Sequence, residues 1–198
     1  MTDVQPPAPA PDLRQLAWNN VIHAEGTRAV FARRYAALRR WTRVRDVLGL
    51  VIPIIVAFLF TTDWVQKFAA YKTLALAFLS FAALAQGLIV VWSILSKWDE
   101  ELAYSTRAMR DSADIRESWR DVGQGLVADI PQSFAICQTR QRLLDSHDDE
   151  KGITAWEMQL GMRAGLIACQ RNCRCGELPH SRKPPRTPAK ACIICGGN

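Results

Sequence analysis

The sequence predicts a mainly α-helical protein: a two-transmembrane helical hairpin, long flanking cytoplasmic helices and a small zinc-ribbon-like C-terminal tail. Three observations lead to this fold class. Residues 47–64 and 73–96 carry almost no charge, apolar residues recur at helical spacing on both sides of them, and five of the six cysteines lie in the last thirty residues. We therefore expect a leader over 1–11, a membrane helical domain over 12–150, and a helix with a cysteine tail over 151–198.

The N-terminal part is expected to be a disordered leader followed by one long helix. Four prolines in the first eleven residues favour an extended, unstructured chain. From Leu13 to Leu38 apolar residues recur at helical spacing, which predicts a helix of about thirty residues that runs into the first uncharged stretch. Gly26 is expected to weaken the middle of this helix.

The two uncharged stretches are predicted to cross a membrane. The first is broken only by Asp63, and its eighteen residues would reach about 27 Å as a helix, close to the roughly 30 Å of a hydrocarbon core. The second has Gln86 as its one strongly polar side chain. A buried helix pair of a soluble protein is the alternative, but neither stretch has a polar face. Pro53 is expected to kink or open the first span.

The distribution of charge predicts the orientation of the hairpin. Six arginines precede the first span, whereas the link between the spans carries only Lys67 and Lys72, so both termini are placed in the cytoplasm. Trp41 and Trp98 would mark the cytoplasmic interface. The aromatic residues of the opposite interface are Trp64, Phe68 and Tyr71. Basic clusters also suit anionic lipid or nucleic acid, with ordinary solubility as the plain alternative.

Three further helical segments are expected after the second span. The first is amphipathic and continues from the membrane, with an apolar stripe. This stripe contains Trp98, Leu102, Met109, Arg116 and Trp119. Gly123, Gly125 and Pro131 should end it, and Cys137 in the next segment should be a buried, inert thiol. The last helix should begin at Thr154 with a capping box to Glu157, and its Trp156, Met158 and Met162 are assigned to the core.

Four C-terminal cysteines form two close pairs that predict a structural zinc site. The pairs are Cys173 with Cys175 and Cys192 with Cys195, each followed by a glycine. Four thiolates would close a tetrahedral shell in a reducing cytosol, where disulfides are disfavoured. Cys169 is an alternative ligand and His180 a weaker one. A ribbon that no longer binds metal and a redox CxxC pair are the alternatives, the second without the βαβ setting it needs.

The words "WEMQLGMRAGL", "CGELPHSRKP" and "CIICGGN" resemble the C-terminal signature of the mobilome CxxC/CxxC protein family of small bacterial proteins encoded on mobile elements. The family pattern has a CxxC first pair and eleven residues before the second pair. This chain has CxC and sixteen residues between Cys175 and Cys192. The two-span hairpin with its flanking helices, residues 12–150, resembles SLATT-type domains, the two-transmembrane effector modules of nucleotide-signalling conflict systems.

These resemblances imply a bacterial inner-membrane effector of a mobile element or antiphage defence system. Its hairpins would form homo-oligomers that permeabilise the membrane, gated by the cytoplasmic parts and by a conflict-system partner. Gln86 and Gly87 are candidates for helix packing in the membrane. The alternative is a membrane-anchored zinc-ribbon module for nucleic acid or a protein partner, although no aromatic residue follows Cys169 to stack on bases. We expect no enzyme, because no constellation of catalytic residues is present.

Overall fold

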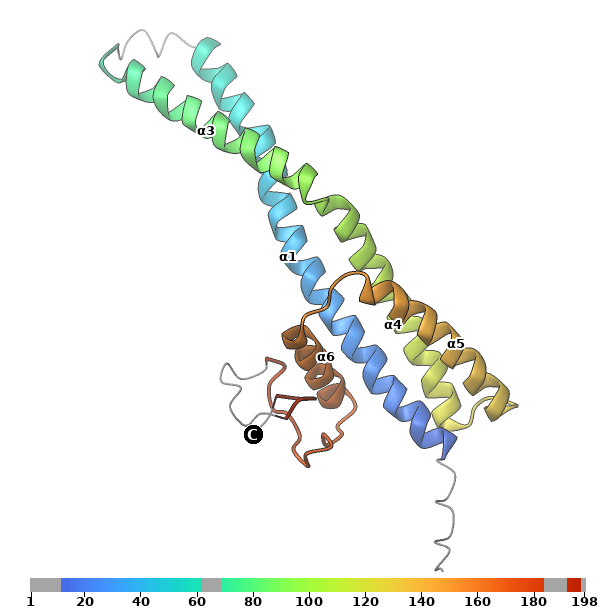
Figure 1. Ribbon diagram of the computed structural model, residues 1–198. Helices are drawn as coiled ribbons and strands as arrows, with labels where there is room; N and C mark the ends of the chain where they lie inside the picture. The colour runs from blue at the N-terminus through green and yellow to red at the C-terminus, as the bar shows by residue number, and fades with distance from the viewer. Residues whose placement is uncertain (1–11, 62–68, 184–191, 197–198) are drawn as a thin grey trace, which may run out of the picture. The chain divides into compact units, whose positions relative to one another are not determined.

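The computed structural model describes residues 12–61, 69–183 and 192–196, and within these ranges the chain forms five α-helices and no strand. The helices are α1 (Leu13–Thr61), α3 (Ala69–Leu95), α4 (Trp98–Gln124), α5 (Ile130–Asp149) and α6 (Ala155–Ala168) (Figure 1). The all-α prediction is confirmed. The leader and residues 62–68 of the link, with Trp64 and Phe68, lie outside the described residues. Two compact units divide the chain: residues 1–33 with 106–198 form unit 1, and residues 34–105 form unit 2.

The core of unit 1 is built by the first part of α1 with α4 and α5. Trp119 of α4 is fully buried, its ring meets Phe134 edge-on at 5.1 Å between centroids, and its indole N–H donates to Gln141 Oε1 at 3.2 Å. The predicted stripe on α4 is confirmed at Trp119, but Ile115 is buried one turn earlier where Arg116 was expected. Arg116 instead forms an ion pair with Glu25 of α1 at 2.8 Å, which explains its partial burial.

The break between α4 and α5 lies where the glycines and the proline predicted it. Gly125 has φ +74°, a backbone conformation that glycine adopts without steric cost. Asp129 then caps α5 by accepting the Gln132 N–H at 3.0 Å, with Pro131 in the first turn. Cys137 of α5 is buried as predicted, and burial raises the pKa of its thiol. This cysteine is therefore a packing residue.

Helix α6 packs on α1 with backbone against backbone. A Cβ atom on Gly161 would lie 2.8 Å from the carbonyl oxygen of Gly26, and one on Gly26 would lie 2.9 Å from that of Gly161. Gly26 was expected to weaken the middle of α1, but the helix is continuous there and Gly26 provides the surface on which α6 is seated. The predicted capping box of Thr154 and Glu157 is confirmed.

The exposed face of α6 differs from the expected one. Trp156 and Met158 were assigned to the core, but they are 38% and 56% exposed. Trp156 is covered on one side by the guanidinium of Arg33, 4.1 Å from the ring centroid, which gives the indole a partner outside the core. The buried face is formed by the residues from Leu160 to Leu166, all of which are buried except Met162, which is half-buried.

Among the described residues, most of the exposed large apolar side chains lie in unit 2. Helix α1 continues through Pro53 to Thr61 without interruption. Among the described residues, one helix is long and apolar enough to cross a membrane: Ala77–Leu95 of α3, with a mean hydropathy of 2.1 and 6% of its residues buried. The other predicted span, residues 47–64, is described only as far as Thr61, and its described part does not meet the same test. The two-span hairpin therefore stays a prediction.

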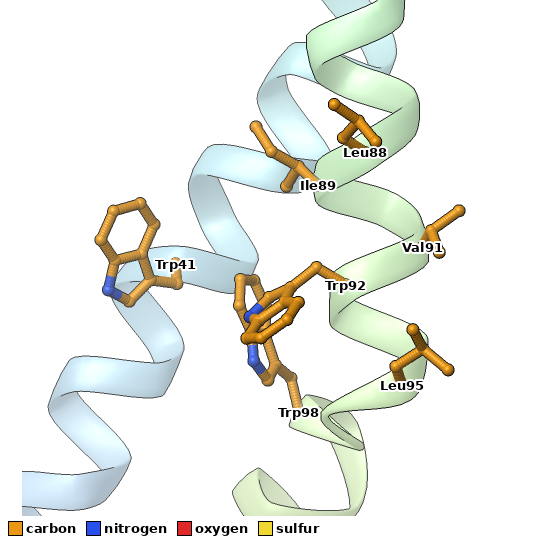
Figure 2. Close-up of a pocket in the computed structure, with 7 residues that line it drawn as sticks. All are labelled: Trp41, Leu88, Ile89, Val91, Trp92, Leu95 and Trp98. Carbon is orange, nitrogen blue, oxygen red and sulfur yellow. The ribbon is translucent and has the colours of Figure 1, made fainter.

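A turn at Ser96–Lys97 separates α3 from α4, so the expected continuous helix is wrong. Lys97 has φ +51°, and α4 restarts at Trp98 with three acidic residues in its first turn, where they complement the helix dipole. The restart lets Trp98 meet Trp41 of α1, with ring centroids 6.5 Å apart. Trp41, Trp92, Trp98 and aliphatic side chains of α3 line an open groove of about 620 Å³ (Figure 2).

Charged groups lie beside this aromatic groove. Arg45 of α1 donates one hydrogen bond to the Ser93 hydroxyl at 2.6 Å and another to the Asp99 carboxylate at 3.1 Å. Ser93 is almost fully buried although α3 is otherwise exposed. The apolar part of α1 begins two residues after Arg45, and the apolar part of α3 ends four residues before Asp99. This cross-link therefore marks the boundary between the apolar and charged parts of unit 2.

Candidate metal centre

The four paired cysteines of the tail meet in unit 1, next to α6. Cys173 and Cys175 follow the end of α6, and Cys192 and Cys195 belong to a separate turn over residues 192–196. Their four Sγ atoms lie within 4.8 Å of one another. Among the described residues, these four cysteines form the cluster of side chains that could bind a metal ion. The predicted clustering is confirmed, although sixteen residues separate the two pairs in the chain.

The spacing of the sulfur atoms fits a tetrahedral metal ion. Cys173 Sγ lies 3.8 Å from Cys192 Sγ, and Cys175 Sγ lies 3.6 Å from Cys195 Sγ. With metal–sulfur bonds of about 2.3 Å, the edges of a regular zinc tetrahedron measure about 3.8 Å. A disulfide needs a sulfur–sulfur distance of about 2.05 Å, and all six cysteines are free thiols. The group could therefore hold a metal ion with little rearrangement.

Both cysteine pairs form a turn that is closed by the glycine after them. In the second pair the Gly196 N–H donates to the Cys192 carbonyl at 2.7 Å, and in the first the Gly176 N–H donates to the Cys173 carbonyl at 2.8 Å. Both glycines have positive φ angles, +63° and +92°. The first turn spans one residue fewer than the second. The missing residue of CxC thus shortens the turn but leaves its closing hydrogen bond in place.

Backbone amides prepare one sulfur for metal binding. The N–H groups of Cys195 and Ile194 point at Cys192 Sγ and lower the pKa of this thiol to about 7. Burial raises the pKa of Cys173, although the N–H of Cys175 acts in the opposite direction. A metal ion would supply the positive charge that keeps such a buried sulfur deprotonated. The arrangement suits a soft or borderline cation bound by four thiolates, for which zinc is the common case.

The cysteine cluster is embedded in a small apolar core and is held by α6. Cys173 and Cys195 are buried with Ile22 of α1 and Leu166 of α6. Arg163 of α6 donates from Nη1 to the Cys195 carbonyl at 2.8 Å and from Nε to the Ser181 carbonyl at 2.7 Å. This role of Arg163 could not be predicted from the sequence, because an arginine in an amphipathic helix is usually assigned to the solvated face.

The remaining predicted site residues lie outside this cluster. Cys169 caps α6 at its C-terminal end and packs against the apolar cores, and burial raises the pKa of its thiol. His180 is exposed, and neither residue belongs to the four-cysteine group. In unit 2, Gln86 Nε2 lies 3.6 Å from the position of a Cβ on Gly49, so Gln86 faces α1. Gly87 faces open space, and its role in helix packing stays a prediction.

Comparison with known proteins identifies one family. Neither a curated protein nor a solved structure gives a significant match. The family described as "Mobilome CxxCx(11)CxxC protein" matches residues 14–198, almost the whole chain. Its description has two CxxC pairs separated by eleven residues, whereas the pairs that converge in this structure are CxC and CxxC separated by sixteen residues. The chain therefore belongs to the mobilome CxxCx(11)CxxC protein family.

Proposed function

We propose that this protein is an inner-membrane effector of a bacterial mobile element or defence system. The apolar parts of α1 and α3 insert into the bilayer as a two-span hairpin, and the metal-bearing helical unit lies in the cytoplasm. The observation that carries this proposal is the exposed apolar surface of α3. Phe78, Leu88 and Leu95 are 71%, 64% and 72% exposed on a helix that buries almost nothing. A surface of this kind is covered by lipid or by a partner rather than by water.

The aromatic groove of unit 2 supports a membrane boundary at its charged end. Tryptophan rings favour the headgroup level, and Trp41, Trp92 and Trp98 line this groove (Figure 2). The Arg45–Asp99 ion pair joins α1 and α4 close by along the chain. A lipid-facing helix with an aromatic and charged border is the arrangement that a membrane span requires. The arginines on the N-terminal side of this border favour a cytoplasmic location for both termini.

Permeabilisation by oligomers is the activity that the proposal assigns to the hairpin. The SLATT-like arrangement of a hairpin between long helices suggests it, and Gly87 offers an open position on α3 where a second hairpin could approach closely. Gln86 points toward α1 and would stabilise the hairpin itself. The cytoplasmic unit would receive the trigger, and the metal centre would keep its tail folded.

Controlled expression in bacteria tests this activity. We expect the protein to remain in the membrane fraction after alkaline carbonate extraction, and its induction to arrest growth and collapse the membrane potential. Gly87→Leu should reduce depolarisation at equal protein level, because a large side chain prevents close helix approach. Ala135→Leu is the matched control, because it places the same large side chain on an exposed position of α5 in unit 1. Extraction by carbonate, or full depolarisation by Gly87→Leu, would contradict the proposal.

A membrane-anchored binding module is the second candidate. The observation that favours it is Ile193, which is 90% exposed at the tip of the second cysteine turn. An apolar side chain presented on a metal-stabilised turn suits a protein partner, and the basic tail suits an acidic one. Copurification that is lost in Ile193→Asp, together with an unchanged membrane potential, would favour this candidate. Salt-sensitive binding of nucleic acid by the full chain would identify the other ligand class.

A further inference from the structure

Arg163 is a buried cation without an acidic partner in the part of the chain that the structure describes. Its side chain extends from the buried face of α6, and the residue is 8% exposed. Among the described residues its guanidinium contacts two carbonyl groups, those of Ser181 and Cys195, and no carboxylate. The sequence offers few candidates, because Glu157 and Glu177 are the only acidic residues after Lys151. Glu157 is engaged in the capping box of α6.

Burying an arginine in this way is unfavourable unless a negative charge lies nearby. Two carbonyl groups satisfy hydrogen bonds but do not neutralise the charge, and an uncompensated buried charge destabilises a fold strongly. Four thiolates around one divalent cation carry a net charge of two negative units. Arg163 binds the backbone of Cys195, one of those four residues, so its charge lies beside this centre.

We propose that Arg163 is the counter-charge and anchor of the four-cysteine metal centre, an inference that rests on the metal binding proposed above. Its two hydrogen bonds join Ser181, which follows the first cysteine turn, to Cys195 in the second. Arg163 thus ties a residue inside the spacer to the second cysteine turn, and this spacer is five residues longer than in the family pattern. A longer spacer makes ring closure less favourable, and a clamp across it offsets part of that cost.

Zinc affinity of the purified full chain in detergent tests this role. Zinc is titrated in competition with a chromophoric chelator for the wild-type chain, Arg163→Gln and Arg163→Lys. Arg163→Gln keeps a hydrogen-bond donor but loses the charge, and we expect it to bind zinc about 10–100-fold more weakly, the usual effect of losing a group that supports metal ligands. Arg163→Lys keeps the charge and should recover most of this loss. Arg182→Met removes an exposed charge from the same segment and should leave the affinity unchanged.

Cobalt substitution and circular dichroism separate a charge effect from loss of structure. We expect Arg163→Gln to retain its helix content and the absorption of a four-sulfur cobalt site, because Arg163 is not itself a ligand. If Arg163→Gln does not fold, Arg163→Lys still tests the role, since wild-type-like affinity is then required of the charged variant. Wild-type affinity in Arg163→Gln, or equal losses in both variants, would overturn the counter-charge. A wild-type chain that binds no zinc would overturn the metal centre together with Arg163, whereas loss of depolarisation alone would affect only the effector function.

Discussion

The contact between α1 and α6 predicts that Gly161→Ala destabilises unit 1. A Cβ on Gly161 would lie 2.8 Å from the Gly26 carbonyl oxygen and 3.0 Å from Val30 Cγ2, so α6 would have to move away from α1. In a free helix the same change would be favourable by about 1 kcal/mol. Overpacking typically costs about 1–3 kcal/mol, and a backbone oxygen cannot rotate away as a side chain can. With the upper end of that range for a backbone clash, about 3 kcal/mol less the roughly 1 kcal/mol of helix propensity leaves a net loss of about 2 kcal/mol.

Thermal unfolding followed by tryptophan fluorescence measures this effect. For a unit of this size, 2 kcal/mol corresponds to a fall in Tm of about 6–10 °C. Gly87→Ala is the control, because nothing lies within 4 Å of its added Cβ in α3, and it should not lower the Tm. A Gly161→Ala chain as stable as the wild type would refute the close seating of α6 on α1, and with it the position of the cysteine cluster beside Ile22.

Three further predictions concern groups in the same unit. The hydrogen bond with Asp145 raises the pKa of His23, so this pair stabilises the fold below about pH 6.5. The contribution is lost as the pH rises through the raised pKa. The wild-type Tm should therefore fall between about pH 6 and about pH 8, and His23→Gln should remove this part of the pH dependence. The difference corresponds to less than about 1 kcal/mol because both side chains are substantially exposed, and equal pH dependence in both chains would disprove it. Trp119→Phe removes the buried indole N–H that donates to Gln141 Oε1, and it should lower the free energy of unfolding in denaturant by about 1–3 kcal/mol. Unchanged stability would contradict this hydrogen bond. In the metal-stripped chain, Cys192 should be half-maximally alkylated near pH 7, as mass spectrometry of iodoacetamide adducts would show, and zinc should protect it; labelling that requires about pH 9 would contradict the amide contacts.

The helices of this protein could be predicted because their causes are local. The capping box at Thr154, the positive-φ glycine at position 125 and the apolar periodicity of α1 all act within a few residues of chain. The break at Ser96–Lys97 was missed, since no glycine or proline accompanies it. Its one local sign is the run of acidic residues after Trp98, which favours a new helix N-terminus.

Long-range contacts could not be predicted in the same way. The sequence assigned Gly26 a destabilising role because its partner, Gly161, is 135 residues away. The cysteine set was found from its spacing alone, but the hydrogen bond that closes the turn of the shortened CxC pair is visible only in the structure. Arg163 was missed entirely, because its burial depends on how the tail folds over α6. Sequence patterns report local preferences, whereas these features arise from tertiary packing.

The metal content of the purified full chain tests the central claim most directly, which is that four thiolates close one metal shell. We predict one zinc ion per chain by elemental analysis, a cobalt derivative with the spectrum of four sulfur ligands, and loss of the metal in Cys195→Ser. Cys169→Ser and Cys137→Ser should retain it, because neither residue belongs to the cluster. A wild-type chain without zinc, or equal loss of zinc in Cys195→Ser and Cys169→Ser, would contradict the claim.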